Sequence, residues 1–255
     1  MTFFRFVGWK MRLAGAMVAM LAVSACVTAT TPEEQAMLEE TNDPLEPMNR
    51  YFFEVNRFID EFFLKPVAWW YRIGVPDPVR NRIHNALTNL TLPWTVANDA
   101  LQGEFSRAGV ATTRFVINST LGVAGLFDVA TDWGYPHHDE DLGQTLAVWG
   151  LPEGPYLVLP VLGPSNPRDA VGFAGAYFGD PVNIGLEEAA NGATIARGAV
   201  SAADTRERNI ETLADIERNA VDFYATIRSI YRQQRASEIR NGAPEEIPLP
   251  GLESD

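Results

Sequence analysis

Side chains that could do chemistry gather mainly in one loop of this 255-residue chain, at residues 131–143. Two histidines and three acids follow one another there: His137, His138, Asp139, Glu140 and Asp141. These are side-chain types that bind divalent metal ions. Neighbouring side chains in a loop seldom converge on one ion, however, and the sequence shows no further ligands at a metal-site spacing. We therefore expect no metal and no cofactor.

A catalytic nucleophile is the second kind of chemistry, and the sequence argues against one. It contains no G-x-S-x-G motif, in which a strained turn exposes a serine. Ser165 has no histidine close to it in the sequence, so only a partner supplied by the fold could complete a catalytic pair. His84 lies among Asn and Arg residues in a helical pattern that is typical of a solvated face. We expect a protein that is not an enzyme.

The only cysteine, Cys26, stands where exported bacterial lipoproteins carry their lipid anchor. Residues 1–25 have a basic start, an apolar run too short to span a bilayer comfortably, and small residues directly before the cysteine. This order predicts a lipoprotein signal peptide over residues 1–25 and acylation of Cys26 after cleavage. The alternative is an ordinary secretory signal with a cysteine nearby by chance.

Acylation would decide where the mature chain resides. One acyl chain anchors a protein only marginally, whereas the three chains of a bacterial lipoprotein hold it on the bilayer. Val27 follows the cysteine, where Asp would favour the inner membrane, so we expect a lipid-anchored protein on the periplasmic face of the outer membrane. No later segment has about 20 uninterrupted apolar residues, so we predict no spanning helix.

The charge of the mature chain limits its partners. Removal of residues 1–25 lowers the Lys and Arg count from 20 to 17 against 33 Asp and Glu, which gives a formal charge of −16. A chain this acidic argues against nucleic acid as a partner and against electrostatic docking on anionic headgroups. Any contact with lipid should therefore be made through apolar surface.

Residues 42–70 form the most informative stretch, because large apolar residues recur there at spacings of three and four. We expect a helix that begins near Asp43-Pro44 and ends or kinks at Pro66. It is either a core helix or a helix lying in a membrane interface, with phenylalanines in the acyl chains and tryptophans at headgroup level. The candidate interface residues are Phe52, Phe53, Phe58, Phe62, Phe63, Trp69 and Trp70.

The rest of the chain is a series of short helices separated by Pro and Gly. We expect helices over 77–90, 93–102, 105–119, 167–178 and 204–239, the last being the longest. Val110, Phe115 and Val116 should be buried in the third of these. Residues 144–164 are apolar but too rich in Gly and Pro for a regular helix, and a short strand at Tyr156–Leu159 would lack an obvious partner.

The domain organisation follows from these patterns. Residues 26–42 are a small-polar and acidic segment that we expect to be a flexible tether. Residues 43–240 form a single helical domain, because no linker divides them. Residues 241–255 are a Pro-rich acidic tail that we expect to be disordered.

Several runs of residues resemble the MlaA (VacJ) family of outer-membrane lipoproteins. The first run is Asn42-Asp43-Pro44-Leu45-Glu46 with Asn49-Arg50, and a second is Arg114-Phe115 with residues 118–122. The most specific run extends from Asp141-Leu142-Gly143-Gln144-Thr145-Leu146 to Arg168-Asp169. Together the runs cover most of residues 42–185. Pro47-Met48 departs from the Gly-Phe that is usual in the family, which could stiffen the start of the helix.

The resemblance implies an all-α, ring-shaped bundle of short helices broken by Pro and Gly, which lies in one membrane leaflet and has a long C-terminal helix. It implies a central amphipathic channel that removes mislocalised phospholipids from the outer leaflet and passes them to a soluble periplasmic lipid-carrier protein. It also implies association with an outer-membrane porin trimer. The alternative is a structural, porin-associated lipoprotein that transports nothing.

Gly and Pro residues are candidates for the mobile or gating parts of such a channel, because they determine the local backbone conformation. Gly and Pro concentrate in the turn at 122–125 and in the apolar segment at 150–164. The candidate gating residues are Gly122, Gly125, Gly150, Pro152, Gly154 and Pro155. Ordinary turns between packed helices are an equally good interpretation of each of them.

Overall fold

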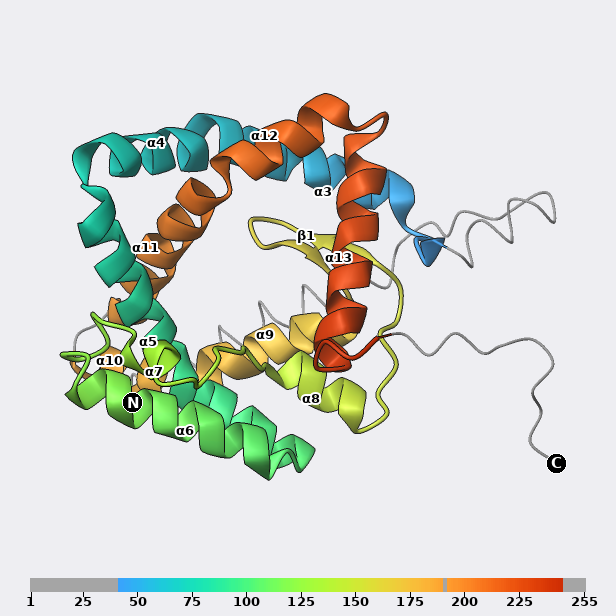
Figure 1. Cartoon of the computed structure of the whole chain (residues 1–255). Helices are drawn as coiled ribbons and strands as arrows, with labels where there is room; N and C mark the ends of the chain where they lie inside the picture. Colours follow the sequence, from blue (N-terminus) through green and yellow to red (C-terminus); the bar gives the residue numbers. More distant parts are fainter. Residues whose placement is uncertain (1–40, 190–191, 245–255) are drawn as a thin grey trace, which may run out of the picture.

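The helices of the computed structural model follow one another around a ring (Figure 1). The structure describes residues 41–189 and 192–244. The predicted signal peptide, the predicted lipidation site Cys26 and most of the predicted tether and acidic tail lie outside the described residues. The described part is mostly helical, so the all-α prediction is confirmed.

The elements run in a simple order along the chain. The first arc contains α3 (Glu46–Ile59), the π-helix η1 (Asp60–Leu64), α4 (Lys65–Gly74), α5 (Asp77–Gln102), α6 (Phe105–Thr120) and α7 (Val129–Asp132). Next come α8 (Leu142–Val148), β1 (Leu157–Leu159), β2 (Gly163–Ser165) and α9 (Pro167–Gly179). The chain then returns through α10 (Pro181–Ala189), α11 (Ala193–Arg208), α12 (Ile210–Asn219) and α13 (Phe223–Ile239).

Neighbouring helices pack in pairs around this ring. The closest pairs are α5 with α6, α8 with α9 and α4 with α11. The hairpin of β1 and β2 contacts α3 on one side and α13 on the other. In Figure 1, α13 stands between the side formed by α3 and α12 and the side formed by α8 and α9. The last helix therefore completes the ring.

Pro66 was predicted to end or kink the first helix, and the predicted end is wrong because the helical stretch continues past this residue. Helix α3 passes into the π-helix η1 and then into α4, which runs to Gly74. A proline inside a helix lacks a donor and its ring collides with the preceding turn. The wider π-turn directly before Pro66 relieves that collision, and Pro66 lies in the first turn of α4, where a missing N–H costs least.

Helix α5 joins two segments that we expected to be separate helices. Residues 77–102 are one helix of 26 residues with Pro93 inside it. Packing against α6, α8, α10 and α11 holds the helix together across the proline, because tertiary contacts outweigh a local penalty. Gly103 ends it in the left-handed conformation at φ 81°, as its position predicted.

The predicted single helix over 204–239 is also wrong, because the structure divides this stretch among α11, α12 and α13. Asn209 separates the first two helices, and Ala220 adopts an extended conformation after α12. Asp222 then accepts a hydrogen bond from the backbone N–H of Ala225 at the start of α13. Capping by such a residue competes with continuing a helix through it. Helix α13 remains a long C-terminal helix and ends before Asn241, as predicted.

The apolar segment at 144–164 contains a helix end, a loop and a hairpin. Helix α8 runs only to Val148, and Gly150 follows it at φ 90°. The predicted strand forms and has a partner after all, since β1 pairs antiparallel with β2 and Val158 stands opposite Pro164. The pair is only three residues long, so it needs other contacts to persist.

Buried side chains in the described part of the chain are more polar than in an ordinary domain. The aromatic core is small and contains Phe53, Tyr156, Val158 and Tyr224. The largest fully buried side chains include Arg114, Asn49, Asn98 and Asp43. In α6 the buried face is formed by Ala108, Ala111, Arg114 and Asn118, so the predicted burial of Val116 is wrong.

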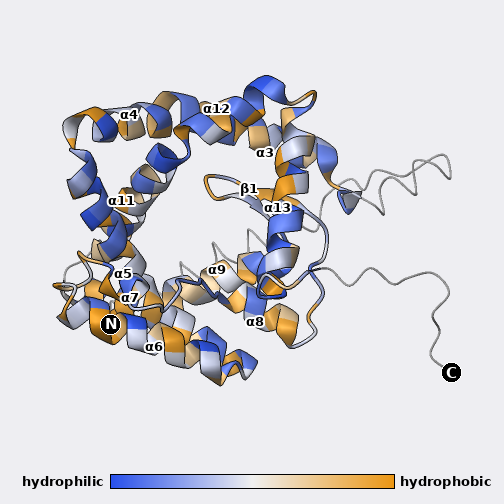
Figure 2. Ribbon diagram, viewed as in Figure 1, coloured by the Kyte–Doolittle hydropathy of each residue, from blue (hydrophilic) through white to orange (hydrophobic). Residues whose placement is uncertain are grey.

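Apolar residues instead recur along helices on every side of the ring, where they alternate with polar residues (Figure 2). A ring built from pairs of helices has little interior, so each helix can bury only a narrow face. Polar networks must therefore supply much of what holds the elements in place.

Candidate functional site

Exposed aromatic side chains follow one another along α3, η1 and α4, and we call this set the exposed aromatic face. Phe62 and Trp70 are 62% and 65% exposed, and the rest of the set is similarly open: Tyr51, Phe58, Phe63 and Trp69. Exposed apolar groups at this density are unusual on a monomeric protein and indicate an interaction surface. The core-helix interpretation is therefore wrong for most of this stretch.

Two of the nominated interface residues behave differently from the others. Phe53 is only 7% exposed and packs edge to face against Phe223 and Tyr224, so it belongs to the core rather than to the interface. Phe52 is half-buried and packs against the same core. The reason is helical periodicity, because Phe53 lies about 200° around the helix from Tyr51, on the side that packs on the core.

Within residues 41–189 and 192–244, none of the helices combines the length and the apolar character that crossing a bilayer requires.

Asparagine side chains of α3 form hydrogen bonds with the backbone of the hairpin. Asn49 is fully buried, and its Nδ2 donates to the carbonyl of Tyr156 at 2.9 Å. Its Oδ1 accepts from the backbone N–H of Val158 at 2.9 Å. A side-chain amide has the same donor and acceptor as a peptide group, so Asn49 pairs with β1 as a neighbouring strand would.

The same arrangement repeats at intervals of seven residues along the chain. Asn56 donates to the carbonyl of Leu159 at 2.9 Å and accepts from the N–H of Val161 at 2.7 Å. Asn42 donates to the carbonyl of Gly154 at 2.7 Å. Seven residues are close to two helical turns, so Asn49 and Asn56 lie on the same side of α3. The three amides together hold residues 154–161.

A buried ionic cluster joins the beginning of the fold to α13. Asp43 is fully buried and accepts hydrogen bonds from the hydroxyl of Tyr224, from Arg228 at 2.6 Å and from Asn49 at 2.7 Å. Asp43 was predicted to start the first helix, but its carboxylate contacts α13 instead. Burial and the Asp43 carboxylate raise the pKa of Tyr224, which keeps its hydroxyl a donor.

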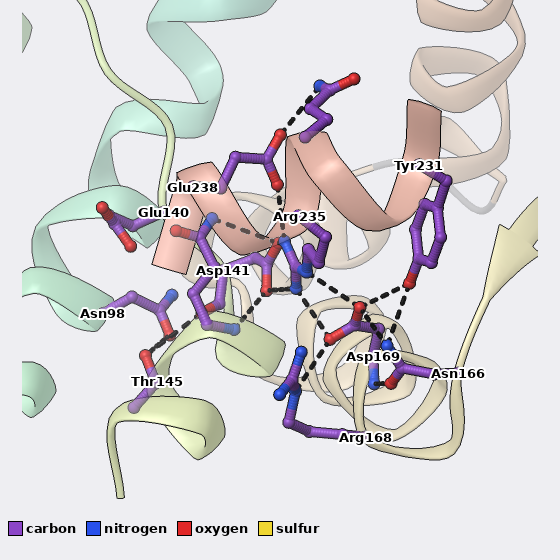
Figure 3. Close-up of polar contacts among 12 residues, drawn as sticks. Asn98, Glu140, Asp141, Thr145, Asn166, Arg168, Asp169, Tyr231, Arg235 and Glu238 are labelled. Atoms are coloured by element: carbon purple, nitrogen blue, oxygen red, sulfur yellow. Dashed lines mark hydrogen bonds and ion pairs between the residues drawn. The ribbon is translucent and has the colours of Figure 1, made fainter. Parts of the chain in front are cut away.

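A second cluster joins α13 to the starts of α8 and α9 through Arg235 (Figure 3). The guanidinium contacts Asp169 at 2.8 and 3.0 Å and Asp141 at 2.7 Å through two nitrogens. Tyr231 donates to Asp169 at 2.6 Å. Gly143 lies against this guanidinium, where a Cβ would come within 2.5 Å of it. One arginine thus pairs with two acids at the starts of different helices, and we call this cluster the Arg235 clamp.

The charges of the Arg235 clamp are stable at neutral pH. Burial opposes ionisation of Asp141 and Asp169, but hydrogen bonds from Arg235 outweigh it and lower the pKa of both carboxyl groups. A carboxyl group with a lowered pKa in the folded state stabilises the fold above its unfolded pKa of about 4. That stabilisation is lost as the pH falls through the folded pKa.

A third cluster fixes α7 on α6. Arg114 is 1% exposed and contacts both oxygens of Asp128 at 3.0 Å, while Asn118 donates to Asp128 at 2.9 Å. Asp128 also caps α7 by accepting from the N–H of Thr131. Partial burial acts to raise the pKa of Asp128. Hydrogen bonds from Thr131, Asn118 and Arg114 outweigh this effect, so the pKa is lowered to about 2.

Replacing Asp128 with asparagine is expected to remove about 2 kcal/mol of stability at pH 7, because a downward pKa shift of this size favours the folded state above pH 4. In the parent protein the contribution of Asp128 should be lost as the pH falls from about 4 to about 2. Thermal unfolding followed by circular dichroism across this pH range measures both effects. An Asp128→Asn variant with the same acid profile as the parent would contradict the assignment.

The nominated gating residues occupy two separate places. Gly122 and Gly125 lie in the turn between α6 and α7, and Figure 1 shows this turn and the hairpin on different sides of the ring. Added Cβ atoms would lie 2.2 Å from the carbonyl oxygen of Phe127 and 2.5 Å from Asn89, respectively. Close packing therefore accounts for both glycines, and a gating role for them stays a prediction.

The other nominated residues precede the hairpin. Gly150 has open space around its Cα, and Pro152 is exposed. Gly154 has φ 71°, and its added Cβ would contact Pro167 at 3.0 Å, while Pro155 is half-buried. The Asn42 amide holds Gly154, whereas residues 149–152 are exposed. A gating role for this segment also stays a prediction.

A cavity of about 830 Å³ opens between α3, η1, β2, α11, α12 and α13. Its apolar wall includes Phe53, Leu213, Phe223 and Ile227, and its charged wall includes Arg57. The volume lies within the range of small-molecule sites, which is about 300–1,000 Å³. Sequence reasoning missed this cavity because elements that are distant in the chain, from α3 to α13, contribute to it.

The polar residues of the 131–143 loop are engaged in pairs. Each histidine of the described chain contacts one carboxylate: His84 with Asp204 at 2.8 Å, His137 with Asp139 at 3.1 Å and His138 with Asp99 at 2.9 Å. The described residues contain no group of three or more His, Cys, Asp or Glu that could hold a metal ion. Ser165 is buried and donates to the carbonyl of Asn166.

The functional residues that sequence reasoning missed are the asparagines and Arg235. The sequence patterns gave no role to the side chains of Asn49, Asn56 and Arg235. The spacing of seven between Asn42, Asn49 and Asn56 was a signal, because polar amides recurring on one helical side need a partner. Nothing in the local sequence of Arg235 identifies its acidic partners.

Comparisons with known proteins agree with this geometry. The family model described as MlaA lipoprotein matches residues 41–238. An uncharacterized protein of Rickettsia bellii is 35% identical over 79% of this chain and 78% of its own. The intermembrane phospholipid transport system lipoprotein MlaA of Escherichia coli is 30% identical over 94% of each chain. A solved structure from work on the maintenance of bacterial outer-membrane lipid asymmetry has a TM-score of 0.68 at 31% identity and covers 77% of this chain and 98% of its own. The chain is therefore a member of the MlaA lipoprotein family.

Proposed function

We propose that this protein is the lipid-anchored outer-membrane component of a phospholipid transport system. It removes mislocalised phospholipids from the outer leaflet through an amphipathic passage in its ring. It then passes them to a soluble periplasmic carrier, which maintains the lipid asymmetry of the membrane. The relatives in Escherichia coli and Haemophilus influenzae, named as intermembrane phospholipid transport system lipoproteins, support this proposal.

The single observation that carries the proposal is the exposed aromatic face of α3, η1 and α4. Burying one phenylalanine in an apolar medium is worth about 1.5–3 kcal/mol, and several act together here. Trp69 and Trp70 at the end of this face fit the headgroup level, where tryptophan is enriched. A ring that lies sideways in one leaflet would bury this face while leaving its polar clusters inside the ring.

A physical mechanism follows from where the charges lie. A charged headgroup at the centre of a bilayer costs between about 3 and about 15 kcal/mol. A passage with charged and apolar walls, such as the cavity beside α3, lowers this cost because the headgroup keeps polar partners while the acyl chains stay in apolar surroundings. Entry from one leaflet only would give the transport its direction.

We also propose the partners that the family resemblance implies, namely an outer-membrane porin trimer and a soluble periplasmic lipid carrier. The exposed apolar residues spread around the ring offer room for both, since they are far more numerous than one helix face. Cys26 would carry the acyl chains that keep the protein on the periplasmic face of the outer membrane.

Two measurements test the transport function. A strain that lacks this protein should accumulate phospholipid in its outer leaflet, detected as surface lipid accessible to an added phospholipase. The protein purified in detergent should carry phospholipid, detected by mass spectrometry of an organic extract. If neither result is obtained, the protein is a structural, porin-associated lipoprotein. Release of lysolipid during incubation with phospholipid would identify an enzyme instead.

Charges placed on the aromatic face should abolish lipid contact. In a Cys26→Ser background, which cannot be acylated, the Phe62→Asp and Phe63→Asp double variant is expected to bind vesicles roughly 100-fold more weakly, because two buried phenylalanines are lost. Flotation with phospholipid vesicles measures the change. Val221→Asp is the matched control, since Val221 is fully exposed at the turn between α12 and α13. Equal loss in both variants would contradict the assignment.

A further inference from the structure

The cavity beside α3 has a charged wall whose pattern is specific. Successive residues at helical spacing alternate in sign along this wall: Glu54, Arg57, Glu61 and Lys65. Arg57 contacts Glu54 at 3.1 Å, and Lys65 contacts Glu61 at 2.8 Å. Each cation in this row thus stands beside an acid, at a spacing of a few ångströms.

The opposite wall adds one carboxylate, Glu217, and one arginine, Arg206, which forms a more buried ion pair with Asp60. Glu217 of α12 contacts Arg57 at 2.7 Å across the cavity. Arg206 of α11 contacts Asp60 at 2.6 and 2.8 Å, and its Nη1 is buried without a hydrogen-bond partner. The wall therefore holds three cations and four carboxylates, a formal charge of −1.

The ion pairs at the open end of the cavity can be replaced by ion pairs with a ligand at a small cost in free energy. The side chains of Arg57, Glu61, Lys65 and Glu217 are 45–59% exposed. Ion pairs this open contribute only about 0–1 kcal/mol each, because water competes for both partners. Arg206 differs, since its side chain is 11% exposed and its two contacts with Asp60 fix it.

We infer that this cavity binds the headgroup of a zwitterionic phospholipid with a primary ammonium, of the phosphatidylethanolamine class. The phosphate replaces a carboxylate beside Arg57 and Lys65, and the ammonium contacts Glu61 and Glu217. The apolar wall takes the first methylenes of the acyl chains. This inference rests on the proposed transport function and specifies its substrate.

The charge balance explains why other headgroups bind more weakly. A net anionic headgroup would pair with the cations but leave four carboxylates beside its own charge, which costs free energy. A choline headgroup carries no N–H donor, so it makes no charge-assisted hydrogen bond to Glu61 or Glu217. Sites for quaternary ammonium groups are usually aromatic cages, and here Arg57 already lies over the Phe223 ring at 5.7 Å.

Equilibrium titration of the full-length protein in detergent tests the inference. The probes are dihexanoyl phosphatidylethanolamine, phosphatidylcholine and phosphatidylglycerol, each below its critical micelle concentration. We expect the ethanolamine lipid to bind roughly tenfold tighter than the glycerol lipid, which corresponds to about 1.4 kcal/mol. The Glu61→Gln and Glu217→Gln double variant should reduce this ratio to within about twofold. Asp215→Asn is the matched control, because Asp215 is an exposed acid of α12 outside the cavity.

The outcomes separate this inference from the proposed function. A preference for ethanolamine that is lost in the double variant and kept in Asp215→Asn supports the inference. Equal binding of all three lipids, or a preference unchanged in the double variant, overturns it and leaves the transport proposal standing. Absence of any binding, together with no co-purified phospholipid, overturns both. Circular dichroism of each variant confirms that it folds.

Discussion

Replacing Arg235 with methionine is expected to lower the free energy of unfolding by about 3–5 kcal/mol, because Asp141 loses its arginine and buried Asp169 loses one of its two arginines. Asp169 is nine-tenths buried and would keep only Tyr231, Asn166 and Arg168 as neighbours. Methionine preserves the apolar stem of the arginine, so the loss reports the charge rather than a cavity. Urea unfolding followed by circular dichroism measures the change.

Arg218→Met is the control for this experiment. Arg218 also contacts an aspartate, Asp215, but both side chains are more than half exposed. A surface pair of this kind should contribute no more than about 1 kcal/mol. The Arg235→Met variant should also lose less stability in acid than the parent, because Asp141 and Asp169 no longer have a lowered pKa. Equal effects of the two substitutions would show that the Arg235 clamp does not hold the ring together.

Replacing Asn49 with alanine is expected to release the hairpin and to cost roughly 2–6 kcal/mol. The substitution leaves the carbonyl of Tyr156 and the N–H of Val158 buried without partners, at about 1–3 kcal/mol for each group. It also removes a donor from buried Asp43. Hydrogen exchange of residues 154–161 locates the effect, and thermal unfolding gives its size.

A matched control is Asn219→Ala, since Asn219 is exposed and donates only to a carbonyl of its own helix. This variant should change the free energy of unfolding by less than about 0.5 kcal/mol. Faster exchange of the hairpin amides in Asn49→Ala but not in Asn219→Ala is the expected pattern. Unchanged exchange in both variants would mean that the hairpin is held by its own two strands.

Local patterns predicted the elements whose structure depends on local energies. The helix at 105–119 was predicted within one residue, because caps and periodicity act over a few residues. Gly103 and Asn241-Gly242 ended helices where expected. The exposed aromatic face was predicted as one of two alternatives, and no local signal could decide between them, since burial depends on what the rest of the chain brings to that face.

The errors share a cause, which is tertiary packing. Pro93 was expected to begin a separate helix and Pro66 to end or kink one, but neighbouring helices and a π-turn accommodate them. The hairpin partner, the Asn49 contact and the Arg235 clamp join residues far apart in the sequence, so no window of sequence contains both members. Sequence periodicity therefore predicted the helices well and the connections between them poorly.

The position of Arg228 and Tyr224 on α13 has a consequence for the order in which the molecule assembles. Their partner Asp43 precedes them by 185 and 181 residues, so it leaves the ribosome long before they do. Until α13 is present, Asp43 cannot form its ion pair with Arg228, and the ring stays open. Long-range contacts of this kind form slowly, because the intervening chain must first be brought into place. Closure of the ring must therefore wait until α13 has been synthesised, which makes it a late step of folding.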